Sequence, residues 1–377
     1  MILHIVEDDK FIDVTYNIFE IVSPNNNEFM VVTKQEKFKY IKTTPITKIS
    51  PLKFLSKRFA KSLNKYEFVV LHWLDDMKKQ LVINAPKNVK FVWIGWGGDY
   101  YGYIDKNLYL PLTRHLVDEM SKTESKISAK SKIKNFIKEK IFLKDVKNID
   151  KVFNKISYFV PPIEEDYLIL KKKFQNFNPK FIDRNYGTLE LSIKQDFIIC
   201  GKNILIGNSA TPENNHLDTF NIISGFDISD RKIICPLSYG NMHYAERIKN
   251  RGQFLFGDNF VPINDFLPIS EYNKIIGSCS IVIMNHLRQQ ALGNILAMMY
   301  FGAKIFLNSE NPIFHFLKRN GAVIFSLEEL NNTSIMDGIS DREIGTNREF
   351  LLGYWSENSV VRKTEKLIKI VKESKHE

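Results

Sequence analysis

Short apolar runs alternate with helical stretches in two separate series along this chain. In the first third, strand-like runs at 3–6, 29–32, 68–74 and 90–96 enclose helical periodicity over 11–22 and 52–64. In the second half, five strand-like runs alternate with helical stretches at about 214–226, 241–252, 270–278, 291–301 and 312–319. The five runs are 203–208, 232–237, 280–285, 303–308 and 322–325. Strands that alternate with helices form parallel sheets covered by helices, so the pattern predicts an α/β fold with two Rossmann-like βαβ domains.

A polar and aromatic stretch at 174–187 separates the two series. It follows a strand-like run near 158–160, which ends at two prolines, and a short helical stretch. A chain of 377 residues also has the length of two domains rather than one or three. We therefore predict a first domain over 1–188, a second over 189–355 and a basic helical tail over 356–377.

The composition is that of an ordinary soluble globular protein, with 44% hydrophobic and 25% charged residues. No run of ~18–20 apolar residues is present that would form a transmembrane helix. The first residues read as a strand rather than a signal peptide, so we expect an intracellular protein. Cys200, Cys235 and Cys279 lie far apart beside apolar runs, which favours reduced core thiols over a zinc site.

The formal net charge of +10 indicates an anionic partner, and nucleic acid, an anionic membrane surface and a phosphorylated substrate all fit. Lysines gather in 121–151, where apolar residues recur at helical spacing. This segment is either a solvated helix with one buried face or a basic amphipathic segment that binds an anionic bilayer. In the second interpretation the membrane-surface residues are Lys130, Lys132, Lys134 and Lys138.

Polar residues follow four strands of the second series, in loops at 207–216, 236–241, 285–294 and 308–312. Ligands of open parallel sheets bind outside the carboxyl ends of the strands, so we expect these loops to share one site. Arg288 can hold a phosphate by paired hydrogen bonds, and Gly293 lets the backbone approach a ligand. The amides of the helix that starts near Ala291 favour an anion. The alternative is that these side chains only cap and solvate their loops.

Further contacts with a bound donor are predicted from the same loops. Glu310 or Asn311 would bind sugar or ribose hydroxyls. The complete set predicted for the donor is Asn208, Ser209, His216, Tyr239, Arg288, Gln289, Gln290, Gly293, Asn294, Asn308, Glu310 and Asn311.

Two strand ends of the first series carry candidate catalytic bases. His72 closes one strand-like run, and Asp99 follows a glycine-rich turn at 95–98. Each also has a structural interpretation, because histidine at a strand end is often a core residue and aspartate often caps a helix. Asp8 and Asp9, after the first strand, share this ambiguity. Two polar edges that face each other across a cleft would suit a nucleotide-sugar donor on one side and an acceptor on the other.

Four stretches together resemble one family of sugar transferases. They are "WIGWGGDYY" (93–101), "GNSATPENNH" (207–216), "PLSYGNMHYAERI" (236–248) and "LRQQALGNILAMMYFGAKIFLNSENP" (287–312). The chain resembles, most densely over 203–325, the TDP-N-acetylfucosamine:lipid II N-acetylfucosaminyltransferases. These are 4-alpha-L-fucosyltransferase-like enzymes of enterobacterial common antigen synthesis.

The resemblance implies a GT-B fold in which the tail at 356–377 returns to the first domain. It also implies transfer of 4-acetamido-4,6-dideoxygalactose from a dTDP donor to a polyprenyl-diphosphate-linked saccharide, without a metal cofactor. The enzyme would be peripheral, at the cytoplasmic face of the bacterial inner membrane. A relative in O-antigen synthesis that uses a similar dTDP-sugar is an alternative. Arg288 and the helix amides after it would stabilise the departing diphosphate.

Two other classes of protein fit parts of this pattern. A nucleotide-sugar 2-epimerase of GT-B architecture would use the same donor site without a lipid acceptor. A non-catalytic basic binding protein is suggested by charge alone, but the chain shows no nucleic-acid motif, so we expect no nucleic-acid partner. The residues leave open the linkage, the stereochemical outcome and the oligomeric state.

Overall fold

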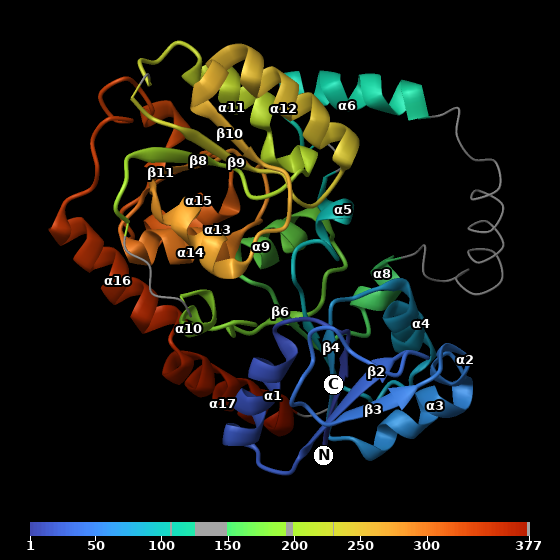
Figure 1. The fold of residues 1–377 in the computed structure, drawn as a ribbon. Coiled ribbons are helices and arrows are strands. Elements are labelled where there is room, and N and C mark those ends of the chain that lie inside the picture. Colours follow the sequence, from blue (N-terminus) through green and yellow to red (C-terminus); the bar gives the residue numbers. More distant parts are fainter. Residues whose placement is uncertain (106–107, 125–148, 194–198, 229, 375–377) are drawn as a thin grey trace. The chain divides into compact units, whose positions relative to one another are not determined.

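The computed structural model describes residues 1–105, 108–124, 149–193, 199–228 and 230–374. The chain forms two compact units, coloured along the sequence in Figure 1. Unit 1 comprises Met1–Lys106, Ser128–Thr188 and Trp355–Glu377, and unit 2 comprises Asn107–Ile127 and Leu189–Tyr354. The predicted first domain, 1–188, included 108–124, which belong to unit 2 in the structure.

Unit 1 contains a parallel sheet in the order β3-β2-β1-β4-β5-β6-β7. The central strands β1, β4 and β5 are apolar runs that are buried along their whole length, as expected for strands covered by helices on both faces. The seven strands are β1 (Ile2–Val6), β2 (Asn27–Val32), β3 (Ile46–Ile49), β4 (Phe68–His72), β5 (Phe91–Ile94), β6 (Tyr158–Val160) and β7 (Lys180–Phe181).

The helices of unit 1 cover this sheet. The last of them, α17, lies beside α1 and buries Leu367, Ile368 and Val371 against the strands (Figure 1). Its Lys372 also contacts Glu67, at 2.7 Å. The helices are α1 (Ile12–Val22), α2 (Pro51–Phe54), α3 (Lys57–Ser62), η1 (Leu63–Lys65), α4 (Asp76–Asn84), α5 (Tyr101–Ile104), α8 (Ile149–Phe153), α9 (Glu164–Lys173) and α17 (Glu357–Glu373).

Unit 2 contains a second parallel sheet, in the order β10-β9-β8-β11-β12-β13. Its strands are β8 (Asn203–Ile206), β9 (Ile233–Pro236), β10 (Phe260–Ile263), β11 (Cys279–Met284), β12 (Lys304–Leu307) and β13 (Phe325–Ser326). The helices are α6 (Pro111–Glu124), α10 (Leu189–Ser192), η2 (Pro212–Asn214), α11 (His216–Ile223), α12 (Met242–Phe256), η3 (Gly257–Asn259), α13 (Ile269–Gly277), α14 (Leu292–Phe301), α15 (Pro312–Arg319), η4 (Leu327–Glu329) and α16 (Asp341–Trp355).

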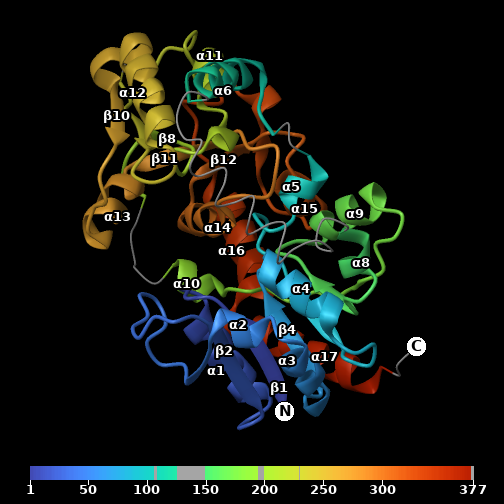
Figure 2. The ribbon, with the colours of Figure 1, turned by 90° about the vertical axis from the view of Figure 1, so that its right-hand side faces the viewer.

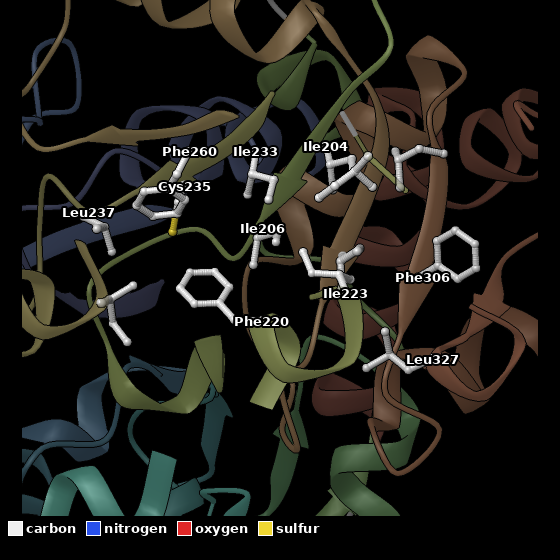
Figure 3. Packing of buried hydrophobic residues seen from close by; sticks show 14 of the residues in the cluster. Ile204, Ile206, Phe220, Ile223, Ile233, Cys235, Leu237, Phe260, Phe306 and Leu327 are labelled. Atoms are coloured by element: carbon white, nitrogen blue, oxygen red, sulfur yellow. The ribbon is translucent and has the colours of Figure 1, made fainter. Parts of the chain in front are cut away.

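One face of this second sheet packs on a continuous apolar core, shown in Figure 3. Ile206 of β8, Phe220 and Ile223 of α11, and Phe260 of β10 meet in it, and each is almost completely buried. Leu116 of α6 adds to the same core, and Figures 1 and 2 show α6 beside α11. The sheet order and this packing hold the carboxyl ends of the strands in fixed positions.

The segment 108–124 belongs to unit 2, and two side chains of that unit hold its backbone. Asp218 accepts hydrogen bonds from the amides of Leu112 and Thr113, both at 3.0 Å, and from the Thr113 hydroxyl at 2.7 Å. The Asn215 side chain accepts the amide of Leu110 at 2.8 Å. A carboxylate at the first turn of α6 satisfies amides that the helix itself cannot pair, which the sequence pattern did not reveal.

Several elements were not predicted. The strands β3 and β10 lie at sheet edges, where β3 is partly exposed and β10 contains Pro262. The helices α4 and α16 lack a strong apolar stripe, and the predicted helix at 52–64 is divided into α2, α3 and η1. The two series of parallel strands, on which the predicted α/β class rested, are present in both units.

Candidate functional site

Four loops follow the strands of unit 2 at their carboxyl ends, and we call them the edge loops. They span 207–215 after β8, 237–241 after β9, 285–291 after β11 and 308–311 after β12. The strand order reverses between β8 and β11, so the first and third edge loops flank the topological switch point of the sheet. This is the position at which open α/β sheets bind their ligands.

Hydrogen bonds join the first edge loop to the second and third. The Asn208 side-chain amide donates to the Tyr239 hydroxyl at 2.9 Å, and the amide of Ala210 donates to the Tyr239 carbonyl at 2.8 Å. The Gln290 side-chain amide donates to Asn208 Oδ1 and to Thr211 Oγ1, both at 3.1 Å. Three of the predicted donor residues thus lie together: Asn208, Tyr239 and Gln290.

A second set of hydrogen bonds joins the third edge loop to the fourth and back to the first. The side-chain amide of Asn308 donates to Asn285 Oδ1 at 2.8 Å, and that of Asn311 donates to the His286 carbonyl at 2.9 Å. Asn215 donates to the Asn285 carbonyl, also at 2.8 Å. All four edge loops therefore belong to one hydrogen-bonded network.

Asn214 lies at the centre of this network and is 1% exposed. Its Oδ1 accepts the Asn208 amide and His286 Nε2, both at 2.9 Å, and its Nδ2 donates to the carbonyls of Ser209 and Thr211. Because Oδ1 only accepts, His286 carries its proton on Nε2, and Nδ1 of the neutral ring is an acceptor. Burial lowers the pKa of His286 to about 3, which keeps the ring neutral.

Four buried polar atoms of this region have no hydrogen-bond partner within the described residues. They are His216 Nε2, Asn285 Nδ2, His286 Nδ1 and Gln290 Oε1. A buried polar group without a partner costs about 1–3 kcal/mol, and such groups are rare in folded proteins. Their concentration at the edge loops makes this region the candidate ligand site of unit 2.

The start of α14 adds an anion-binding element to the third edge loop. Its N-cap, Ala291, has φ +57° and ψ +23°, the left-handed conformation, and provides no side-chain cap. The first-turn amides of an α-helix lack intrahelical acceptors and favour an anion. Gly293 and Asn294 are exposed on this turn, and a Cβ at Gly293 would lie 3.4 Å from Ser192 Oγ.

Arg288 lies on the same loop and is half-buried. Its Nη1 donates to the Gln289 carbonyl at 3.2 Å. Burial and then the Arg288 charge lower the pKa of His286, and the same charge opposes the rise in the pKa of Tyr109 that burial causes. The guanidinium is thus close to the edge loops and to the segment before α6. That segment was not predicted to take part in the site.

Other predicted donor residues have structural contacts of their own. Asn311 is fully buried and caps α15 through Ile313, while Ser209 bonds to Thr211 at 3.1 Å. His216 is buried, and its Nδ1 lies 3.1 Å from the Tyr244 hydroxyl. Gln289 is buried and Glu310 is exposed.

The sequence interpretation did not single out Asn214, Asn215, Asn285 or His286. All four lie inside the edge loops, and nothing in the sequence distinguishes Asn285 and His286 from the polar residues beside them. The available signal was the adjacent pair Asn214–Asn215 before a helix, because asparagine tolerates left-handed backbone, and Asn215 has φ +52°.

The two predicted catalytic bases lie in unit 1 and are buried. His72 is 1% exposed, its Nε2 lies 3.2 Å from His4 Nδ1, and burial holds its pKa well below the usual value. Asp99 accepts hydrogen bonds from the Leu74 amide, the Trp93 indole and the Trp96 amide at 2.8–2.9 Å. Through these contacts Asp99 connects the loop that contains Leu74 to the loop that contains Trp96. A catalytic role for His72 or Asp99 stays a prediction.

The predicted membrane-surface residues Lys130, Lys132, Lys134 and Lys138 lie outside the described residues. Within the described ranges, no helix combines the length and the apolar character needed to span a bilayer. In the same ranges, no group of three or more His, Cys, Asp or Glu side chains is arranged to hold a metal ion.

Comparison with known families agrees with the sequence resemblance. Residues 176–346 match the family described as 4-alpha-L-fucosyltransferase glycosyl transferase group 56. The matched residues include all four edge loops, and the match confirms the predicted family resemblance.

Solved structures similar to this chain share its fold at low sequence identity. Sucrose-phosphate synthase from Thermosynechococcus elongatus is 7% identical, with a TM-score of 0.61 and coverage of 98% of each chain. HepE from Anabaena, in complex with UDP and glucose, is 9% identical with a TM-score of 0.62, over 98% of this chain and 99% of that one. A glycosyltransferase from Rickettsia africae is 13% identical with a TM-score of 0.59, over 99% of each chain. These similarities confirm the predicted GT-B fold.

Proposed function

Since this chain is a GT-B glycosyltransferase whose residues 176–346 match the 4-alpha-L-fucosyltransferase family, we propose that it transfers 4-acetamido-4,6-dideoxygalactose or a similar sugar from a dTDP donor. The acceptor is a polyprenyl-diphosphate-linked saccharide of enterobacterial common antigen or O-antigen synthesis. The enzyme works at the cytoplasmic face of the bacterial inner membrane. The family match supports glycosyl transfer, and the sequence resemblance supports this choice of sugar and acceptor.

The observation that carries the donor site is the network of the edge loops with its four unpartnered buried atoms. Asn285 Nδ2 is a hydrogen-bond donor and suits a phosphate or carbonyl oxygen, whereas His286 Nδ1 and Gln290 Oε1 are acceptors and suit hydroxyl or amide hydrogens. A nucleotide diphosphate that carries a sugar offers both kinds of group. HepE, which shares the fold, has been solved with UDP and glucose.

In this proposal the leaving diphosphate is stabilised by Arg288 and by the first-turn amides of α14. The charge that develops on the diphosphate in the transition state meets groups that are already oriented by the network. No metal cofactor is required for this step. Transfer that is unchanged by a chelator such as EDTA supports this assignment, and loss of transfer that added Mg²⁺ restores contradicts it.

A thermal-shift panel of dTDP, UDP, GDP and CMP tests the donor directly. A ligand that binds only the folded form stabilises it and so raises the melting temperature. At a ligand concentration of 100 times the Kd, the free energy of unfolding increases by about 2.7 kcal/mol. We expect dTDP to give the largest shift. An equal shift by all four nucleotides, or none, contradicts the dTDP assignment.

Incubation of the protein with a dTDP-sugar, with and without a lipid-linked saccharide, separates transfer from epimerisation. We expect the sugar to be consumed only when the acceptor is present. Isomerisation of the sugar by the protein with the donor alone would identify an epimerase instead.

Membrane binding is assigned to the lysine-rich segment. Lysines near an anionic surface contribute about 1 kcal/mol each. Neutralising Lys130, Lys132, Lys134 and Lys138 should therefore release the protein from vesicles that contain anionic lipid, while the dTDP-induced thermal shift is retained. Unchanged vesicle binding refutes this part of the proposal.

A further inference from the structure

A pocket of about 640 Å³ lies at the edge of the unit 1 sheet that is opposite the carboxyl ends of its strands. Lys90 directly precedes β5, Ser157 directly precedes β6, and Lys180 is the first residue of β7. These three strands are parallel neighbours, so their amino ends meet at this edge. The pocket is therefore separate from the strand ends that carry the predicted bases His72 and Asp99.

The wall of this pocket is strongly basic. Among the described residues that line it, five are lysines and none is an aspartate or a glutamate. Like charges repel, so this concentration of positive charge disfavours the folded state until an anion compensates it. The lysines are Lys87, Lys90, Lys151, Lys155 and Lys180, and together we call their site the basic pocket.

Two of these lysines have structural contacts at helix ends. Lys155 Nζ donates to the carbonyls of Ile83 and Ala85, at 2.6 and 2.8 Å, where α4 ends. Lys90 Nζ donates in the same way to two carbonyls at the end of α17, at 2.9 and 2.6 Å. The last carbonyls of a helix have no intrahelical donor and carry a partial negative charge, so a cation is favourable there.

The helix ends do not account for the whole charge of the pocket. A helix C-terminus is equivalent to roughly −0.5 of an elementary charge, so two of them offset about one of the five ammonium charges. Burial, and then the positive charge of Lys87, lower the pKa of Lys155, so the two ammonium groups repel each other. Lys87 is exposed and has no hydrogen bond or ion pair with any residue that the structure describes.

The rest of the wall suits a small molecule rather than a single bare ion. Ile83 and Val89 supply apolar surface. Asn154, Ser157 and Asn178 supply hydrogen-bonding groups, and Asn178 Nδ2 donates to Asn154 Oδ1 at 2.6 Å. The volume lies within the range of about 300–1,000 Å³ that small-molecule sites occupy. Phosphate oxygens accept hydrogen bonds from ammonium groups and carry the negative charge that the wall lacks.

We propose that the basic pocket binds a ligand that carries two or more phosphate groups, at a site separate from the donor site of unit 2. Lys87 contacts a phosphate oxygen directly, while Lys90 and Lys155 keep their bonds to the helix ends and act through their charge. A soluble phosphorylated molecule and the headgroup of a phospholipid offer the same chemistry to these lysines. Binding supplies the missing negative charge, so a filled pocket stabilises the folded chain.

The test measures binding of inorganic pyrophosphate to the full chain by titration calorimetry, with saturating dTDP present so that the edge loops are occupied. It compares Lys87→Gln with Lys57→Gln, which removes the same charge from an exposed position of α3 outside the pocket. A unit charge at about 4 Å from another in water changes a dissociation constant about fivefold. Lys87→Gln should raise the Kd for pyrophosphate by at least that factor, and Lys57→Gln should leave it unchanged.

Melting temperatures separate ligand binding from a structural role of the pocket. Without pyrophosphate, Lys87→Gln should melt no lower than the wild type, because the substitution removes a charge that repels Lys155. Lys155→Gln should melt lower, because two helix carbonyls lose their donor. Pyrophosphate should raise the melting temperature of the wild type and of Lys57→Gln, and raise that of Lys87→Gln less.

Two further arms identify the source of the phosphate groups. Vesicles of phosphatidylcholine with and without cardiolipin, whose headgroup carries two phosphates, measure binding to a lipid. Weaker binding of Lys87→Gln than of Lys57→Gln to the cardiolipin vesicles, reversed for the wild type by pyrophosphate, identifies a lipid headgroup. Equal vesicle binding by the two variants, with the fivefold difference in Kd for pyrophosphate, identifies a soluble ligand.

Hydrogen exchange locates the site directly. Pyrophosphate should slow exchange at the amides of 87–90 and 154–157, which belong to the wall of the pocket. Equal binding of pyrophosphate and of vesicles by the wild type and Lys87→Gln overturns the proposal, as does protection that is confined to the edge loops. None of these measurements requires sugar transfer, so the basic pocket and the proposed function are refuted independently.

Discussion

Alanine at Gly207 should disturb the first edge loop and the network around Asn214. Gly207 follows β8 with φ +66°, a left-handed conformation that costs an L-residue about 1–2 kcal/mol. A Cβ there would lie 2.6 Å from His216 Nε2 and 2.7 Å from Asn214 Oδ1. Both distances are shorter than van der Waals contact, so the first edge loop has to move.

The size of the effect follows from these two terms. Overpacking of a well-packed site costs about 1–3 kcal/mol, so the total for Gly207→Ala is about 2–5 kcal/mol. For a unit of this size, 1 kcal/mol lowers the melting temperature by about 2–4 °C. Asn214 accepts hydrogen bonds from Asn208 and His286, so its displacement should also reduce nucleotide binding.

Gly345→Ala is the matched control, since Gly345 lies inside α16 and a Cβ there meets no atom within 4 Å. Alanine in a helix interior is more favourable than glycine by about 0.5–1 kcal/mol, so this variant should melt slightly higher. Differential scanning fluorimetry with and without dTDP measures both quantities for each variant. A Gly207→Ala protein with the wild-type melting temperature and the wild-type dTDP shift would refute the reasoning about this loop.

Three other predictions follow from the same contacts. Asp218→Ala leaves the buried amide of Thr113 without its acceptor, which costs about 1–3 kcal/mol, and hydrogen exchange should increase over 108–124. Arg184→Met should raise the melting temperature, because Nη1 and Nη2 of this buried guanidinium have no partner within the described residues. The expected increase in the free energy of unfolding is up to about 4 kcal/mol. A lower melting temperature would show that the contact of Arg184 with Phe19 contributes more than the unpaired charge costs. Stability should decrease as the pH falls from 6.5 toward about 3. In this range buried His4, His216 and His286 stay neutral in the folded chain, whereas the same histidines bind protons in the unfolded chain. Urea unfolding at several pH values measures the free energy of unfolding.

The fold was predictable because its central strands are buried on both faces. Such strands have to be continuous apolar runs, as β4 and β11 are, and the sequence therefore reports them directly. Edge strands have no such requirement, and β3 and β10 were missed for that reason. The placement of 108–124 could not be predicted either, because it depends on Asp218, about a hundred residues away in the chain.

The location of the donor site was predictable to the level of loops, but not of atoms. Polar residues after parallel strands have to lie at one edge of the sheet, so the four edge loops could be named in advance. A polar residue at a strand end can nevertheless bond to its own backbone or to a ligand, and its type does not decide between them. Asn311 caps α15 and holds the third edge loop, whereas the side-chain donor of Asn285, which was not named, has no partner among the residues that the structure describes.

The same ambiguity applies to the carboxylates at the strand ends of unit 1. Asp8, Asp9 and Asp99 all follow strands, and the sequence gives no reason to prefer one of them. The structure separates them by the number of protein hydrogen bonds that each carboxylate accepts: three for Asp8, three from neighbouring groups for Asp99 and one for Asp9. A carboxylate that accepts several hydrogen bonds holds the fold around it, as Asp8 and Asp99 do. Within the described residues, unmade hydrogen bonds of buried side chains gather at Asn285, His286 and Gln290 of unit 2, and the proposed donor site rests on them.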